Sequence, residues 1–164
     1  MAGRRKKLLR GSGTWLTAQV LGHDDPFVVV LRGHCELERL LNEVLLSGHE
    51  ARQGSLEAMD LRWNQKLELA IYLGRVSEQL GPAMRKLNSI RNDLAHGSEA
   101  ELTTKHEHEL WTSFPPALRR LLVDGWNEIS EAPFDDGKQG SRLRLVTAGL
   151  AMALSGSLDE SGIR

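Results

Sequence analysis

The spacing of apolar residues most limits the folds open to this chain, because it repeats with the period of an α-helix and nowhere alternates with period two. The clearest helical run opens at Gly81-Pro82 and ends before Gly97. Within this run the apolar residues return every three or four positions and define one buried stripe, formed by Met84, Leu87, Ile90 and Leu94. The pattern predicts an all-α protein.

The same criteria predict helices before and after this run. Asp25-Pro26 supplies an N-cap and a proline at the first helical position, so a long helix should begin there and end near Ser47-Gly48. A second run contains Trp63 and ends near Gly74, after a loop around Gly54-Ser55. Further helices are expected at about residues 14–21, 99–112, 116–129 and 142–154. The predicted architecture is an up-and-down bundle of four to six helices.

Length and composition predict a single domain. The 164 residues are 40% hydrophobic and 26% charged, which is ordinary for a globular protein that buries one core. The division we expect is a basic, flexible tail at residues 1–13, one helical domain at 14–154, and a flexible polar tail at 155–164. Cys35 is the only cysteine, which excludes an internal disulfide, and we expect it to pack inside a helix.

The distribution of charge argues against a general nucleic-acid binder. The first ten residues carry five of the 21 basic residues and none of the 22 acidic ones, so the remainder has 16 basic against 22 acidic side chains, or −6. A polyanion would therefore need a local basic pocket or the tail. No apolar run reaches the roughly 20 residues of a membrane span, and no secretory signal follows Arg4. We expect a cytoplasmic protein without a membrane partner.

A polar stripe accompanies the apolar one in the run that ends at Gly97. Asn88, Asn92 and His96 are spaced by four and share this stripe. Arg91 lies about 140° from His96 around the axis, yet its long guanidinium arm can reach the same ligand. A symmetry-related copy of the helix would bring two Arg91 and two His96 side chains together. The result would be a local basic pocket on an acidic body.

Such a pocket suits metal-independent cleavage of RNA, in which the 2′-OH attacks its own phosphate. His96 is the natural acid or base near pH 7, and Arg91 offers a planar fork to the phosphoryl oxygens. Asn92 can orient either group. Asn88 and the basic tail are candidate RNA-binding groups, the tail through Arg4, Arg5, Lys6 and Lys7.

The spacing of these residues alone does not decide the function. An arginine followed by histidine after four to six residues is expected roughly once or twice in a random chain of this composition. The alternative interpretation is structural. In it, Arg91 forms a surface salt bridge, Asn92 is solvated, and His96 is placed favourably at the negative end of the helix dipole.

Residues 26–98 resemble the HEPN superfamily of small helical domains. Three segments carry the resemblance, and they are Leu37-Glu38-Arg39-Leu40-Leu41-Asn42-Glu43-Val44-Leu45, Lys66-Leu67-Glu68-Leu69-Ala70-Ile71-Tyr72-Leu73-Gly74 and Leu87-Asn88-Ser89-Ile90-Arg91-Asn92-Asp93-Leu94-Ala95-His96. The family signature is Arg, a polar residue, three to five further residues, then His. Arg91-Asn92 with His96 matches its shortest spacing.

The resemblance implies a four- or five-helix bundle that dimerises through the signature helices. Many members are ribonuclease toxins or defence effectors, which would make Arg91 and His96 catalytic and Asn92 supporting. The expected partners are then a second copy, RNA, and an antitoxin or regulatory protein. The resemblance extends equally to non-catalytic relatives such as the mannitol operon repressor group, so a regulatory or interaction module is the alternative.

The remaining candidates favour structural interpretations. His106 and His108 lie two positions apart, about 200° around a helix, so they cannot share a metal, and a solvated face is expected. We predict no metal and no cofactor. The four tryptophans fall in helical patterns, which favours packing in the core or a dimer over base stacking, and they are Trp15, Trp63, Trp111 and Trp126.

Overall fold

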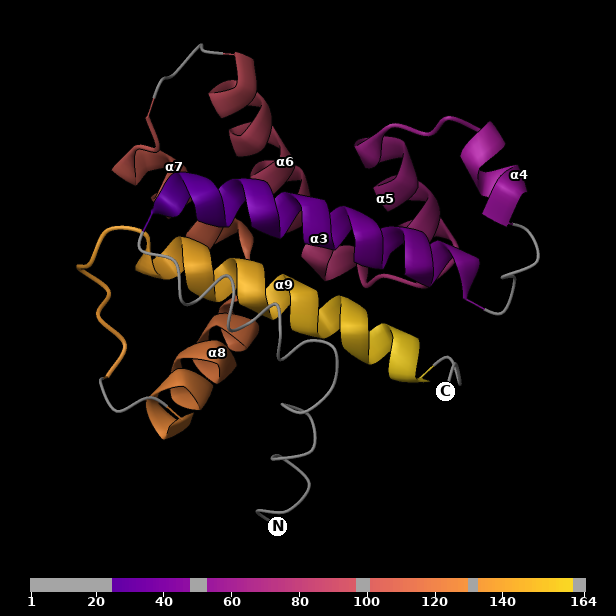
Figure 1. The fold of residues 1–164 in the computed structure, drawn as a ribbon. Coiled ribbons are helices and arrows are strands. Elements are labelled where there is room, and N and C mark those ends of the chain that lie inside the picture. Colours follow the sequence, from indigo (N-terminus) through magenta and orange to yellow (C-terminus); the bar gives the residue numbers. More distant parts are fainter. Residues whose placement is uncertain (1–24, 48–52, 97–100, 130–132, 161–164) are drawn as a thin grey trace.

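The computed structural model describes residues 25–47, 53–96, 101–129 and 133–160, and the described part consists of helices joined by turns and loops, with no strand (Figure 1). The all-α prediction is confirmed. None of the described helices is both long and apolar enough to cross a lipid bilayer. The elements are α3 (Pro26–Leu46), α4 (Gln53–Ala58), α5 (Trp63–Tyr72), the 3-10 turn η2 (Glu78–Leu80), α6 (Gly81–His96), α7 (Thr104–Ser113), α8 (Pro116–Ile129) and α9 (Ser141–Glu160).

The helices α3 and α9 form the centre of the molecule and run side by side in the same direction (Figure 1). A Cβ atom built on Gly140, just before α9, would lie 3.1 Å from Cγ of Pro26 at the start of α3, so the two N-terminal ends are neighbours. A Cβ atom on Gly33 would lie 2.3 Å from Cγ2 of Thr147, which shows how closely the two backbones approach. Because this pair is parallel, the bundle is not up-and-down throughout.

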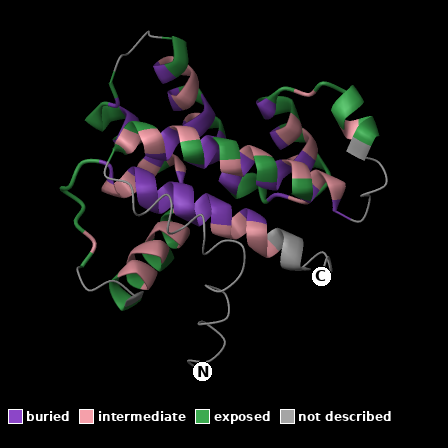
Figure 2. Cartoon of the chain, viewed as in Figure 1, coloured by how far each residue is buried: buried purple, intermediate pink, exposed green. Residues whose placement is uncertain are grey.

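The helix α9 is the most deeply enclosed element. Every residue from 143 to 151 is buried, and Figure 2 shows this half of the helix in one colour. Its helix partners are α3, α7 and α8. On the other side of α3, the helices α5 and α6 pack against it, and α7 covers α6. The helix α6 therefore lies in the outer layer, with its last turn leading away from the centre (Figure 1).

Most predicted helix boundaries are confirmed. Asp25 caps α3 through its side chain, which accepts a hydrogen bond of 2.8 Å from the Phe27 amide. The bounds of α6 and α8 agree with the predicted runs at 81–96 and 116–129. The predicted helix at 14–21 and the expected tail at 1–13 lie outside the described residues.

Three boundaries were predicted wrongly. Residues 53–58 form the helix α4 rather than a loop, although they contain Gly54-Ser55. The helix α7 begins at Thr104, not near residue 99, because Thr103 caps it. The helix α9 continues to Glu160, whereas a flexible tail was expected from Ser155. Small residues in these segments suggested irregular backbone, but they do not prevent helix formation.

Candidate functional site around the helix α6

The buried stripe of α6 is the part of the site that the sequence predicted best. Met84, Leu87 and Ile90 have no exposed surface, and Leu94 is 8% exposed. The opposite face reaches solvent and is polar or small in character, through Pro82, Arg85, Ser89, Asn92 and His96. The stripe therefore fixes how the helix is rotated about its axis, and so decides which of its polar side chains meet solvent.

Arg91 lies at the margin of the buried stripe and is half-buried. Its Nη1 donates a hydrogen bond of 3.0 Å to Oδ1 of the neighbouring Asn92. No carboxylate among the described residues pairs with this guanidinium, so the interpretation of Arg91 as a surface salt bridge has no support. Within the described residues, this guanidinium is therefore oriented by an amide and has no anionic partner.

His96 occupies the last turn of α6 and is exposed. Within the described residues no hydrogen bond or ion pair joins it to Arg91, as their angular separation on the helix led us to expect. Arg91 and Asn92 are therefore brought together in a single chain, while His96 is placed on the same helix but apart from them.

Asn88 belongs to a buried hydrogen-bonded chain that links three helices. Nε2 of His34 on α3 lies 2.9 Å from Oδ1 of Asn88, and Nδ2 of Asn88 donates to Oδ1 of Asn64 on α5 over 3.1 Å. Asn88 is only 8% exposed. A side chain this enclosed, with two partners already, is poorly placed to touch RNA directly, although the sequence suggested it as an RNA-binding residue.

His34 is held as a neutral imidazole at the junction of α3, α5 and α6. Its ring stacks on the indole of Trp63, with centroids 5.3 Å apart and 26° between the planes. Burial lowers the pKa of His34 below its ordinary value. The hydrogen bond with Asn88 and the Glu38 carboxylate raise the pKa, and the Arg91 guanidinium lowers it. Burial is the largest of these influences, so the imidazole is uncharged near pH 7.

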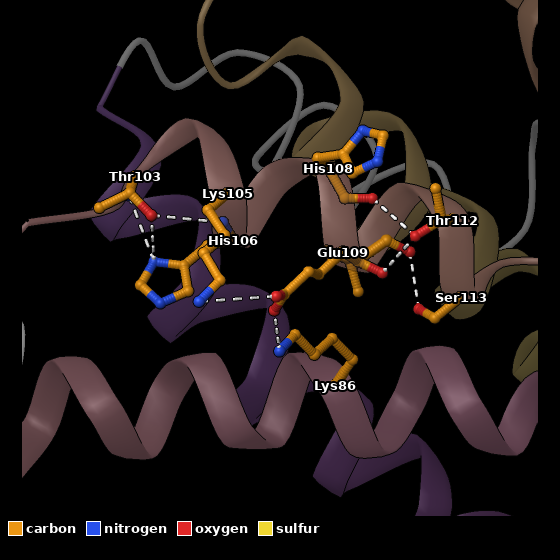
Figure 3. A network of polar contacts seen from close by, with 9 residues as sticks. Lys86, Thr103, Lys105, His106, His108, Glu109, Thr112 and Ser113 are labelled. Carbon is orange, nitrogen blue, oxygen red and sulfur yellow. Dashed lines mark hydrogen bonds and ion pairs between the residues drawn. The ribbon is translucent and has the colours of Figure 1, made fainter.

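A second polar network, shown in Figure 3, joins α6 to α7. Nζ of Lys86 forms an ion pair with the Glu109 carboxylate, which lowers the pKa of that carboxyl, and Lys105 lies 4.0 Å from the same group. The Lys86–Glu109 ion pair joins α6 to α7, whereas Lys105 and Glu109 both belong to α7.

The expectation of a solvated face for both histidines of α7 is wrong for His106. This side chain is 6% exposed and completes a capping box, because the Thr103 amide donates to its Nδ1 over 3.2 Å and its own amide donates to Thr103 Oγ1 over 3.3 Å. His108 is exposed, as expected. The expected packing of Cys35 is also wrong, since this thiol is exposed on α3.

The other predicted groups divide between core and undescribed segments. Trp63 is buried and Trp111 is half-buried against the core, which agrees with packing roles. The described residues contain no group of three or more His, Cys, Asp or Glu side chains that could hold a metal ion. The candidate RNA-binding tail, comprising Arg4, Arg5, Lys6 and Lys7, lies outside the described residues.

The sequence missed the contribution of α3 and α5 to this region. His34 stands in an apolar helical run, and Asn64 follows a core tryptophan without any motif. No local signal pairs either residue with Asn88. Comparison of the chain with models of known protein families, with curated proteins and with solved structures found no match.

Proposed function

We propose that the protein is a homodimeric endoribonuclease of the HEPN type, acting as a toxin or defence effector. The observation that carries the proposal is the Arg91 guanidinium, which is oriented by Asn92 and has no carboxylate partner among the described residues. The same helix exposes His96 in its last turn. An arginine that can contact phosphoryl oxygens and a histidine that can transfer a proton are the two components that metal-independent phosphodiester cleavage needs.

The proposed reaction is a transfer within the RNA. The ribose 2′-oxygen bonds to the adjacent phosphorus, the bond from phosphorus to the 5′-oxygen breaks, and the products carry a 2′,3′-cyclic phosphate and a 5′-hydroxyl. His96 of one protomer accepts the 2′-OH proton, and the equivalent residue of the second copy protonates the leaving oxygen. Arg91 donates two parallel hydrogen bonds to the phosphoryl oxygens as negative charge increases there. Asn92 keeps the guanidinium in position.

A second copy of the chain is part of the proposal. A single copy offers one guanidinium and one imidazole about 140° apart around the helix, whereas the proposed reaction uses a histidine from each of two copies. The exposed face of α6 has no large apolar side chain that would prevent two such helices from approaching each other. The expected species in solution has twice the 18.3 kDa mass of the chain. Light scattering that finds only 18.3 kDa at tens of micromolar would argue against this dimer.

A non-catalytic interaction module is the second candidate, and a different observation favours it. Tyr72 is 86% exposed and Leu73 is 50% exposed at the end of α5, so two large apolar side chains meet solvent beside each other. A partner protein, such as an antitoxin or a regulator, could cover them. In this case Arg91 and His96 would affect partner binding or dimerisation, and there would be no RNA cleavage to lose.

The decisive experiment compares RNA cleavage by the wild type with Arg91→Ala, His96→Ala and the double variant. Each single change should reduce the rate by roughly a hundredfold or more. The double variant should be little worse than the poorer single variant, because residues that act as a unit are not additive. Arg91→Lys keeps the charge without the planar fork and should recover only part of the activity.

Matched controls separate the site from the surface in general. Arg120→Ala removes an exposed arginine from α8, and His108→Ala removes an exposed histidine from α7, so neither should change the rate. Circular dichroism checks folding, and the reaction is repeated in EDTA with analysis of the RNA ends. Equal cleavage by wild type and His96→Ala would mean a contaminating nuclease and would leave the interaction module. Activity that is lost in EDTA and restored by a divalent ion would overturn the mechanism.

A further inference from the structure

The hydrogen-bonded series His34, Asn88 and Asn64 reaches the surface at Asn64, in the first turn of α5. Its other end is His34, which is 6% exposed, and Asn88 between them is 8% exposed. Asn64 itself is exposed. These hydrogen bonds therefore connect the interior of the molecule to one amide group that solvent can reach.

The direction of the hydrogen bonds fixes the orientation of this amide. Nδ2 of Asn88 donates to Asn64, so Oδ1 of Asn88 faces His34 and accepts a hydrogen from Nε2 of the imidazole. Oδ1 of Asn64 is in turn occupied as the acceptor. The Nδ2 group of Asn64 then has no partner among the described residues, and the residue that carries it is exposed.

The position of Asn88 on α6 places this amide next to the proposed site. Asn88 precedes Arg91 by three residues and Asn92 by four, so both lie about one helical turn, roughly 5 Å, further along the helix. Arg91 is also close enough to His34 to lower the pKa of that imidazole. One turn of α6 therefore separates the Arg91 guanidinium from the Asn88 amide that holds Asn64.

Among the charged groups that act on His34, one positive charge is left without a counter-charge. The carboxylate that acts on His34 belongs to Glu38, and it already pairs with Lys66 over 2.8 Å. His34 is neutral. Arg91 is then the uncompensated charge among the groups that act on His34, and the Asn64 donors add to an anion-binding surface. Amide donors next to a guanidinium are well suited to phosphate oxygens.

We propose that Asn64 is a further RNA-contacting residue, which donates from its amide to a backbone phosphate next to the one that Arg91 binds. The inference rests on the function proposed above and adds the first turn of α5 to the RNA-binding surface. Asn88 and His34 are positioning residues in this arrangement, because they hold the Asn64 amide and do not touch RNA themselves.

A pair of isosteric substitutions in the same helical turn tests the proposal. Asn64→Asp replaces the donors with a carboxylate and keeps an oxygen that can accept from Asn88. Gln65→Glu makes the same change of charge one residue later, and keeps the oxygen that accepts from the Arg62 amide over 2.8 Å. Both residues are exposed, so the long-range electrostatic effects should be nearly equal. A difference between the variants reports a contact at Asn64.

The measurement is binding of a fluorescent single-stranded RNA oligonucleotide by anisotropy, with the full chain carrying His96→Ala so that the RNA stays intact. Asn64→Asp should weaken binding by at least tenfold, and Gln65→Glu by less than about threefold. Asn64→Ala, which removes the donors without adding charge, should weaken binding to an intermediate extent. Circular dichroism of each variant controls for folding.

Each outcome decides a different question. Equal losses for Asn64→Asp and Gln65→Glu, or unchanged binding by Asn64→Ala, would overturn the role of Asn64 and leave the proposed ribonuclease intact. Absence of RNA binding in the His96→Ala protein, together with absence of cleavage by the wild type, would overturn both proposals. A tenfold or larger difference within the pair, with wild-type cleavage present, supports both.

Discussion

The helices α9 and α6 differ in how many of their faces are buried. In α9, all residues from 143 to 151 are buried, whichever way they point. In α6, one stripe is buried, one margin carries half-buried polar groups, and the remaining face meets solvent. Both helices contact three others, α9 with α3, α7 and α8 and α6 with α3, α5 and α7, so the difference lies in the side of α6 that its neighbours leave open.

This comparison indicates which changes affect stability and which affect chemistry. A helix that is enclosed on all sides depends on shape, so changes of volume there should alter the free energy of unfolding. A helix with one open side can carry unpaired donors and charges at low cost, because water solvates them in the free protein. We therefore expect substitutions in α9 to reduce stability and substitutions at the margin of α6 to reduce activity.

The largest effect should come from a cavity in α9. Leu150 has no exposed surface, and Leu150→Ala should lower the free energy of unfolding by about 2–5 kcal/mol. Urea denaturation measures the change. Ser89→Ala, on the exposed face of α6, is the control and should change stability by less than about 0.5 kcal/mol. Equal losses from both variants would contradict the contrast between the two helices.

A smaller loss is expected where α3 touches α9. Gly33→Ala introduces a methyl group 2.3 Å from Cγ2 of Thr147, so overpacking should cost about 1–3 kcal/mol in thermal or urea unfolding. Thr147→Ser deletes that methyl group and should restore much of the loss in the double variant. Gly125→Ala in α8 is a matched control, because no atom lies within 4 Å of its Cβ position. It should stabilise the helix by roughly 0.5–1 kcal/mol.

The pH dependence of stability should reveal the neutral His34. Its folded-state pKa lies below the ordinary value of 6.5, so the unfolded chain binds the proton more readily. The contribution to stability is complete above pH 6.5 and is lost as the pH falls towards the folded-state pKa. The slope for one group is at most about 1.4 kcal/mol per pH unit.

The measurement is urea unfolding from pH 7.5 to pH 5 for the wild type and His34→Gln, which keeps a donor for Asn88 but does not titrate. The wild type should lose stability faster than the variant in acid. Parallel curves would show that His34 takes up its proton equally well in both states, and would contradict its burial as the cause of the pKa shift.

The smallest effects on stability are expected at the proposed catalytic residues. Arg91→Ala and His96→Ala should each change the free energy of unfolding by less than about 0.5 kcal/mol, since neither side chain belongs to the buried stripe. The same proteins should lose cleavage by roughly a hundredfold. If a loss of stability accounted for the loss of activity, these residues would contribute to the fold and not to the chemistry. Substitutions at the margin of α6 would then act as those in α9 are expected to act.

Local sequence signals were sufficient for much of the fold. Asp25-Pro26 predicted the start of α3, and Gly81-Pro82 with Gly97 predicted both ends of α6. The apolar spacing within α6 identified its buried stripe correctly, because that pattern depends only on residues close in sequence. Caps and apolar periodicity are local properties, so a single sequence contains them.

The structural setting of the site could not be predicted in the same way. Asn88 is buried against His34, which is 54 residues away, and against Asn64, which is 24 residues away. No local pattern indicates such partners. Asn88, Asn92 and His96 share a stripe at four-residue spacing, yet the structure buries Asn88 and exposes His96, because their neighbours on other helices differ.

The close contact between α3 and α9 has a consequence for how the chain folds. Gly33 and Thr147 lie 114 positions apart in sequence, as the difference between their numbers shows, so the central helix pair joins opposite ends of the domain. During synthesis, α3 emerges long before its main partner. Its α9-facing surface stays uncovered until the helices α4 to α8 and then α9 have been translated. Closing so long a loop is entropically slow, and contacts of this range lower folding rates. The central helix pair therefore forms late in folding, after the helices between α3 and α9 are available.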